Sequence, residues 1–218
     1  MLRIRKAKSA AENNIPFGYV KVGYPARENW QEEEFYAFAQ QKIEQLKEKY
    51  ASYDRKVVFG ENPHYRFFKK FKKTYPVMLQ FESVAFKDRP FPSANPVTDV
   101  AFLLEITTFM LSGTHDADFI KGGVELYIAT EKEDFMGMRD MLHTYPNDFC
   151  ARDGEGIIFS EIAGTDNRTC AKQDSKNVFY PVFGTPDMPK ETIEKAIDTL
   201  TEYIKVLAPA AEIESEIL

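Results

Sequence analysis

The chain has 218 residues, of which 44% are hydrophobic and 28% charged, and its formal net charge is −6. Its 18 Phe and 11 Tyr residues supply enough apolar surface for a sizeable core, which excludes a disordered chain. No apolar run reaches the roughly 18 residues that a membrane-spanning helix needs, so no membrane partner is expected. A net negative charge does not suit binding of nucleic acid over the whole surface. DNA is therefore not an expected partner, and any RNA contact must use a local patch.

The basic start of the chain contains no apolar core, so a secretory signal is not expected. Cys150 and Cys170 stand outside any CxxC pair, which argues against structural zinc and favours two reduced cysteines in a cytoplasmic protein. His64, His115 and His143 are far apart, and none lies in an HExxH motif. Glycine-rich phosphate loops and a GxSxG elbow are absent from the sequence. We therefore expect neither a metal nor a cofactor.

The first predicted elements lie before residue 51. Alternating apolar residues predict a strand over 17–22. Asn29 and Glu32 have the spacing of a capping box, and apolar residues then recur every three or four positions, so we expect a helix over 30–50. The opposite face of this helix carries Glu, Gln and Lys and should be solvated.

Two further elements are expected before residue 76. Residues 56–59 read as a short strand that ends at Gly60. Asn62 and Pro63 predict a helix start, with asparagine as the cap and proline in the first turn. This helix should end before Pro76, because the residue before a proline avoids the helical region.

The clearest helix start follows at Asn95, which should cap the helix, and Pro96, which takes the first position. Residues 97–111 are apolar on nearly all sides, so this helix should lie in the centre of the fold. Ser112 and Gly113 should close it.

From residue 122 onward the pattern changes to short strands separated by Gly, Asp and Asn turns. The candidate strands are residues 124–129, 149–151, 157–160 and 178–183. Pro181 cannot donate a hydrogen bond within a sheet, so we expect an edge or a bulge there. A final amphipathic helix is predicted over 189–207. Helices, then strands, then a covering helix indicate an α+β layered fold.

Two candidate sites rest on residue type alone. His115 follows the buried helix, where a loop could hold it at the mouth of a pocket. Glu131, Glu133 and Asp134 cluster after a strand. Paired carboxylates can carry acid–base chemistry, but acidic turns are also common on ordinary surfaces.

The run 66–73 interleaves basic and aromatic residues. It could bind RNA phosphates and stack on bases, or it could be an amphipathic helix with buried Phe and solvated Lys. On the RNA-binding interpretation the contact residues are Arg66, Lys69, Lys70 and Lys73.

Several short motifs between residues 61 and 187 occur in the order of one known family. They are Phe81-Glu-Ser-Val-Ala85, Asn95-Pro-Val-Thr-Asp-Val100, Leu126-Tyr-Ile-Ala129 followed by Glu133 and Phe135, Cys150-Ala-Arg-Asp-Gly154 with Ile157-Ile158, Ala163-Gly164 and Asn177-Val-Phe179. Their order and spacing resemble the third and fourth B domains of the phenylalanyl-tRNA synthetase β subunit, and stand-alone proteins built from that module. The resemblance implies an α+β layered sandwich of mixed or antiparallel sheets with helices.

In that synthetase the module hydrolyses tyrosine wrongly attached to phenylalanine tRNA, a second sieve where binding alone discriminates too little. The resemblance implies a pocket between the buried helix and the later strands, in which water attacks the ester of an aminoacyl-tRNA 3′ end. His115 falls near the family's pocket histidine and is the implied catalytic residue. The residues implied at the substrate pocket are Glu82, Asn95, Asp99, Asp118, Glu133, Gly164, Asn167 and Arg168.

This chain departs from the family pattern at two places. The family glutamate that reads the tyrosine hydroxyl falls at Pro181, and a Gly-Gly pair is replaced by Asn167-Arg168. A site that loses its partner for a hydroxyl loses that discrimination, so tyrosine specificity does not follow. Asn95 and Asp99 could equally be a helix cap and a first-turn carboxylate.

Three hypotheses remain from the sequence. The first is a free-standing aminoacyl-tRNA deacylase acting in trans, which is not a full tRNA ligase because no ATP-binding segment is visible. The second is a non-catalytic module that binds an amino acid, a modified nucleoside or an RNA end. The third is an interaction domain that docks a partner through the helix at 30–50. We expect residues 1–60 to form a strand–helix extension, 61–187 the editing-like domain and 188–218 a covering helix and tail, all within one compact unit.

Overall fold

The structure is a computed structural model that describes residues 2–87, 89–186 and 188–218. The helices are α1 (Lys8–Glu12), α2 (Glu32–Lys49), α3 (Arg55–Phe59), α4 (Pro63–Lys70), α5 (Pro76–Phe86), α6 (Pro96–Thr108) and α7 (Lys190–Leu207), with short 3-10 helices η1 (Arg27–Asn29) and η2 (Ala117–Phe119). The strands are β1 (Ile4–Lys6), β2 (Phe17–Gly23), β3 (His115–Asp116), β4 (Val124–Ile128), β5 (Asp134–Met136), β6 (Met141–His143), β7 (Phe149–Arg152), β8 (Ile157–Ser160), β9 (Gly164–Thr165), β10 (Asn177–Phe183) and β11 (Glu212–Ile217). This content confirms the predicted α+β class.

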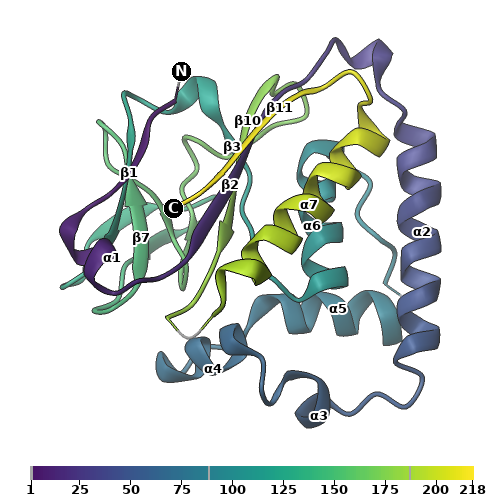
Figure 1. Ribbon diagram of the computed structural model, residues 1–218, viewed down its shortest axis with the longest axis horizontal. Coiled ribbons are helices and arrows are strands. Elements are labelled where there is room, and N and C mark those ends of the chain that lie inside the picture. Colours follow the sequence, from purple (N-terminus) through teal and green to yellow (C-terminus); the bar gives the residue numbers. More distant parts are fainter. Residues whose placement is uncertain (1, 88, 187) are drawn as a thin grey trace.

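Two sheets and a group of helices form the layers of the molecule (Figure 1). One sheet has the strand order β1-β4-β7-β8-β9 and the other β11-β2-β10-β3, while β5 and β6 form a hairpin. Phe17 of β2 packs on Phe149 and Phe159 of the first sheet, with ring centroids 5.7 and 6.3 Å apart. On the opposite face, a Cβ added to Gly18 would lie 2.4 Å from Ile193 of α7. The second sheet is therefore covered by the first sheet on one side and by α7 on the other.

Strand β2 lies inside the second sheet and confirms the strand predicted at 17–22. It pairs antiparallel with β11 on one side and with β10 on the other. Strand β1 pairs with β4, and this pairing is parallel. Segments from the beginning, the middle and the end of the described chain thus share the two sheets and one core.

The apolar helix α6 lies in the centre of the helical layer, as predicted. Val97, Leu103 and Leu104 are fully buried, and α2, α5 and α7 all contact this helix. The predicted apolar stripes of α2 and α7 are buried as well: Phe35, Ala39, Ile43 and Leu46 in α2, and Ile193, Ala196, Ile197, Leu200, Ile204 and Leu207 in α7.

The strand predicted at 56–59 is wrong, because this segment is the helix α3. The carboxylate of Asp54 accepts the backbone N–H groups of Lys56 and Val57, at 2.8 and 3.0 Å, and so caps a helical turn. A good cap satisfies backbone donors that a short isolated strand would leave open.

The helix predicted at 30–50 is confirmed as α2, but its predicted cap is wrong. Asn29 ends the 3-10 helix η1, and Gln31 takes the N-cap position without a side-chain cap bond. Asn62 does cap α4, through its side-chain oxygen and the N–H of Tyr65 at 3.0 Å.

Helix α4 ends before Pro76, as predicted, whereas α6 ends earlier than predicted, and a residue with positive φ follows each of them. Helix α4 ends at Lys70, and Lys72 has a φ of +57°. Helix α6 ends at Thr108 rather than near residue 111, because Phe109 takes the left-handed conformation with a φ of +57°. The carbonyl of Phe109 then accepts the hydroxyl of Tyr75 at 2.9 Å, which fixes this end of the helix.

Pro181 pairs with Tyr19 of β2 without a shift in register, so the expected bulge is wrong. The carbonyl of Pro181 accepts the N–H of Gly113 at 3.0 Å, and the N–H of Phe183 donates to Leu111 at 3.0 Å. This side of β10 therefore faces the chain before β3. The proline costs no ladder bond to β2, because its nitrogen points to the other side.

Both Cys150 and Cys170 are free thiols. Among the residues that the structure describes, no helix is long and apolar enough to cross a membrane, and no cluster of three or more His, Cys, Asp or Glu side chains could hold a metal ion.

Candidate functional site

A pocket of about 320 Å³ opens between α4, the segment that follows α6, and the strands β8 to β10. Phe68 and Lys73 line it on the helical side, and Ser112 lies between the layers. The turn at 160–165 and Phe183 form the wall on the sheet side. This turn includes Gly164, whose φ of +115° favours glycine. Gly164 is thus the predicted substrate residue that does line the pocket.

His115 does not lie in a loop at the pocket mouth, as its sequence position suggested. It is part of β3 and is fully buried, with Nδ1 2.8 Å from the hydroxyl oxygen of Thr169. Its Nε2 has no partner among the described residues. Burial, helped by the charge of Arg168, lowers the pKa of His115 to about 3, so the imidazole is neutral.

The ring of Phe159 separates His115 from the pocket. The two ring centroids are 5.7 Å apart, and Phe159 itself lines the pocket together with Phe183. The centroids of Phe159 and Phe183 are 4.8 Å apart in an edge-to-face contact. Two aromatic rings therefore form an apolar inner wall, with the histidine behind it.

Sequence reasoning missed the acidic groups buried around this pocket. Glu161 lines the pocket, and its Oε1 is 3.3 Å from Nδ1 of His64, with both side chains excluded from solvent. Glu105 accepts the backbone N–H and the hydroxyl of Ser112, at 3.0 and 3.2 Å. Burial raises the pKa of Glu105 to about 7 and raises that of Glu161 well above its ordinary value.

Asp148 is a further buried carboxyl group, next to Ser160 in the wall of the pocket. It accepts the hydroxyl of Ser160 and, at 3.3 Å, the N–H of Ile162. Burial raises the pKa of Asp148 to about 7. The Ser160-Glu161 pair directly after an apolar strand was the one sequence signal for this polar cluster, whereas His64 gave none.

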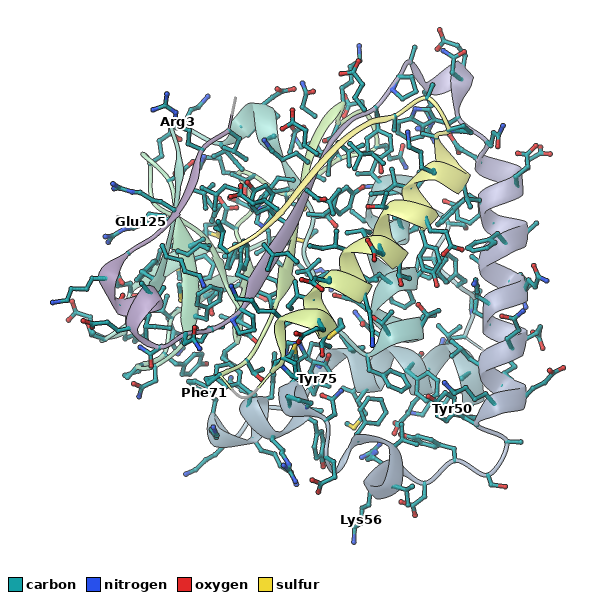
Figure 2. All side chains as sticks on the ribbon, in the orientation of Figure 1. Arg3, Tyr50, Lys56, Phe71, Tyr75 and Glu125 are labelled. Atoms are coloured by element: carbon teal, nitrogen blue, oxygen red, sulfur yellow. The ribbon has the colours of Figure 1, made fainter. Side chains whose placement is uncertain are left out.

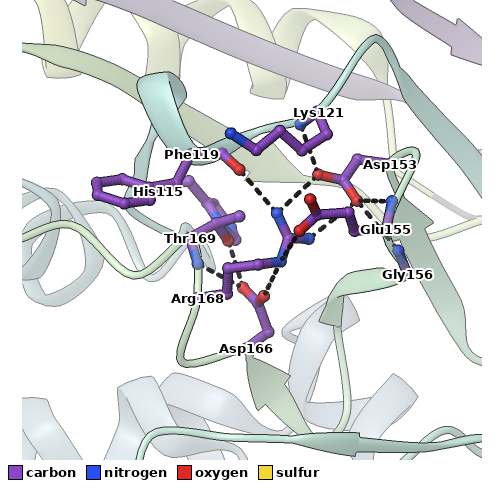
Figure 3. A network of polar contacts seen from close by, with 9 residues as sticks. All are labelled: His115, Phe119, Lys121, Asp153, Glu155, Gly156, Asp166, Arg168 and Thr169. Atoms are coloured by element: carbon purple, nitrogen blue, oxygen red, sulfur yellow. Dashed lines mark hydrogen bonds and ion pairs between the residues drawn. The ribbon is translucent and has the colours of Figure 1, made fainter.

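Arg168, predicted as a pocket residue, instead joins two loops (Figure 3). Its Nη1 and Nη2 each lie 2.9 Å from a carboxylate oxygen of Asp153, and Nη1 also donates to the carbonyl of Phe119 at 2.7 Å. Asp166 lies 3.7 Å from Nε of Arg168 and accepts the N–H of Thr169, which bonds His115. A continuous chain of polar contacts thus runs from His115 to the turn at Asp153.

Asn95 and Asp99 both lie at the start of α6. Asn95 holds the N-cap position, but its side chain donates to the carbonyl of Ala171 at 3.3 Å rather than capping the helix. Asp99 accepts the hydroxyl of Tyr36 at 2.9 Å. Burial raises the pKa of Asp99, although that hydrogen bond acts against the rise. Both residues are held by contacts at the opposite end of α6 from the pocket.

The other predicted pocket residues are scattered. Asp118 accepts the side chain of Asn177 at 3.0 Å, and Glu133 accepts the hydroxyl of Tyr127 at 3.3 Å. Asn167 is exposed, and its backbone N–H donates to β5. None of these three predicted residues is among those that line the pocket.

Glu82 lies in the helical layer. It binds the guanidinium of Arg55 through two hydrogen bonds of 2.7 and 2.6 Å, and it accepts the hydroxyl of Tyr53 at 2.8 Å. Arg66 pairs with Glu61. Both of these predicted site residues are therefore engaged in ion pairs on the helical side.

The basic run forms the amphipathic helix that was one of its two interpretations. Phe67 and Phe68 are buried, while its lysines are exposed. Lys73 also lines the pocket, with Nζ 5.1 Å from the ring centroid of Tyr145. Lys69, Lys70, Lys72 and Lys73 are exposed, and of these four Lys73 is the one that lines the pocket. Figure 2 shows Phe71 and Tyr75 of this region at the junction of helices and sheets.

The chain is thus an α+β protein with a pocket at the junction of its helices and strands. No protein-family model matches the chain. Over 89 residues, which are 40% of this chain, it is 34% identical to the phenylalanine–tRNA ligase β subunit of Mycoplasma genitalium. That match confirms the predicted resemblance to the β subunit, and it spans only 11% of the subunit's length.

A crystal structure of an N-terminal fragment of the phenylalanyl-tRNA synthetase β subunit from Pyrococcus horikoshii aligns with 97% of this chain and 50% of that fragment. The sequence identity is 12% and the TM-score is 0.49.

Proposed function

We propose that this chain is a free-standing, editing-like protein that hydrolyses a mischarged aminoacyl-tRNA in trans. The observation that supports this most is the pocket of about 320 Å³, which the exposed Lys73 lines and which lies next to the exposed lysine run that ends at Lys73. Its volume lies within the range of small-ligand sites. The local identity to a tRNA ligase subunit suggests the aminoacyl ester as the ligand.

The tRNA 3′ end would lie along the exposed side of α4. Lys69 and Lys70 would neutralise its phosphates, which is the main source of affinity for nucleic acid. The amino acid would then enter between α4 and the aromatic wall formed by Phe159 and Phe183. Such a wall suits an apolar side chain of the amino acid. Lys73 is the one Lys or Arg among the described residues that line the pocket.

Hydrolysis would use a water molecule that attacks the ester carbonyl. The ammonium group of Lys73 would stabilise the negative charge that develops on the carbonyl oxygen. His115 is neutral and lies behind Phe159, so its Nε2 reaches a bound ester only when that ring turns aside. As long as the ring of Phe159 stays in place, His115 therefore has a positioning role and does not contact the ester.

A second candidate function is binding of an amino acid or an RNA end without hydrolysis. The burial of His115 and the proline at position 181 favour it, because neither offers a ready polar group to the pocket. Under this hypothesis a bound ligand raises the melting temperature by mass action, while no ester is cleaved.

A panel of mischarged tRNAs separates the two functions. The deacylase proposal expects release of at least one amino acid faster than the uncatalysed rate, and slower release by Lys73→Ala and His115→Gln. Lys195→Ala, an exposed lysine on α7, is the matched control and should leave the rate unchanged. Uncatalysed rates across the panel would reject hydrolysis. Ligand-dependent melting shifts in the same samples would then support the binding function.

A further inference from the structure

A second opening lies between the two sheets, away from the pocket. It has a volume of about 910 Å³. One wall consists of residues 2–5, 121–125 and 152–154, and the other is the face of β2 and β11 that carries Tyr19 and Glu216. We call this opening the wedge. Figure 2 labels Arg3 and Glu125 on its side of the molecule, and Tyr75 near the pocket on another side.

The carboxylates of the first wall are already neutralised. Glu125 binds two guanidinium groups, with Arg5 at 3.0 Å and Arg152 at 2.6 Å. Asp153 is held by the bidentate contact of Arg168. Two arginines thus face the single carboxylate of Glu125, so these three side chains together carry one net positive charge.

The carboxylates of the second wall are engaged too. Glu214 lies 2.5 Å from Nζ of Lys21, and Glu216 accepts the hydroxyl of Tyr19. Each acidic side chain that lines the wedge thus has a hydrogen-bonding partner within the protein, and repulsion of an anion is reduced accordingly.

Two cations of the wedge have no such partner. Arg3 and Lys121 are exposed, and neither forms an ion pair within the described ranges. Gly122 and Gly123 follow directly, and their backbone N–H groups donate to no acceptor among the described residues. Gly122 has a φ of +76°, and a Cβ built there would meet nothing within 4 Å. Lys121 and the open amide groups therefore share one loop, and Arg3 lies beside it, since a Cβ built on Gly123 would be 3.7 Å from the Cβ of Arg3.

The loop that carries these groups is held rigidly (Figure 3). The N–H of Lys121 donates to Asp153 at 2.8 Å, and its carbonyl accepts the N–H of Gly154 at 2.8 Å. Asp153 is fixed in turn by Arg168. A preorganised loop loses little conformational entropy when a ligand binds.

We propose that the wedge binds a phosphate-bearing ligand through Arg3, Lys121 and the backbone of Gly122 and Gly123. A terminal phosphate carries about two negative charges and a phosphodiester about one, and both present several acceptor oxygens, which match two cations and adjacent amide donors. The ligand is either a free nucleotide or the phosphodiester chain of an RNA. The inference is independent of hydrolysis in the pocket.

Two probes distinguish these sources, pyrophosphate and a fluorescently labelled short single-stranded RNA. The test compares the wild type with the double variant Arg3→Ala/Lys121→Ala. The matched control is Lys49→Ala/Lys195→Ala, which removes the same charge from exposed positions on α2 and α7. We expect the wedge variant to weaken binding about tenfold or more, and the control to bind as the wild type does.

Tight pyrophosphate binding that the RNA cannot displace would assign a free nucleotide. RNA binding that pyrophosphate displaces only weakly would assign the phosphodiester chain. Equal losses in the wedge and control variants would show unspecific attraction and overturn the proposal, as would failure of the wild type to bind either probe. The melting temperatures of the three proteins, measured without probe, show whether folding is intact, and a Lys121→Gln variant repeats the test if the double variant is unstable.

Discussion

Glu161 and His64 meet inside the protein, with 3.3 Å between Oε1 and Nδ1 and with both side chains closed off from water. Burial raises the pKa of Glu161 well above its ordinary value and lowers that of His64 to about 3, so burial favours the uncharged form of each group. A neutral pair avoids the large cost of burying two charges. Because His64 belongs to α4 and Glu161 follows β8, their contact ties the two sides of the pocket together.

Removing one member of this pair should destabilise the protein. We expect His64→Ala to lower the free energy of unfolding by about 2–4 kcal/mol, because it leaves a buried carboxyl group unpaired beside a cavity. Glu161→Gln keeps a neutral side chain with an acceptor oxygen and should cost less. Urea unfolding of both variants measures the difference. Equal losses would contradict this expectation, because they would mean that a glutamine cannot replace the glutamate beside His64.

Stability should depend on pH through His115. Its folded pKa, about 3, is below the ordinary value of 6.5, so its contribution is complete above pH 6.5 and is lost as the pH falls towards 3. The loss has a slope of at most about 1.4 kcal/mol per pH unit. The unfolding free energy of His115→Gln, compared with the wild type at each pH, should show a flatter decline over this window. Parallel curves would contradict a neutral, buried His115.

The Arg168–Asp153 ion pair should be worth more than an ordinary surface pair. The side chain of Asp153 is excluded from solvent, whereas that of Arg168 is 26% exposed. Arg168→Ala leaves a buried carboxylate without its partner, and we expect a loss of about 2–4 kcal/mol. In the double variant Arg168→Ala/Asp153→Asn, the loss of unfolding free energy should be smaller than the sum of the two single losses. A double-mutant cycle by chemical unfolding measures this coupling, and full additivity would show that the contact is not stabilising.

The lysines of α4 should govern the salt dependence of tRNA binding. If Lys69 and Lys70 each contact a phosphate, the double change to alanine should weaken binding uniformly across tRNAs. It should also reduce the slope of log K against log salt by about two. Filter binding at several salt concentrations gives the slope. A slope equal to that of the wild type would place the RNA elsewhere on the surface.

Many of the helices and strands could be predicted from the sequence, because the local sequence patterns agreed with the tertiary structure. The apolar residues of α6, the cap of α4 and the apolar stripe of α7 are such signals, and each predicted an element that exists. Asp54 was overlooked as a cap, and the segment after it was read as a strand. Strand β11 carries Glu at alternate positions, and its two isoleucines, Ile213 and Ile217, are separated by Ser215 and only partly buried, so its apolar signal is weak.

The candidate site was harder to predict than the fold. The resemblance gave Gly164 and His115 by alignment, but burial decides what each can do, and no local pattern shows that Phe159 separates His115 from the pocket. His64 and Glu161 are 97 residues apart. Only the folded chain brings them together, so neither stood out in the sequence.

The placement of β2 between β10 and β11 constrains how the protein can assemble. Residues 17–23 are made early in synthesis, yet one edge of this strand stays unpaired until residues 212–217 have been made. Contacts between such distant segments slow folding, and an open strand edge invites pairing with other chains in the meantime. Until β11 pairs with it, β2 therefore keeps one edge that can pair with another chain.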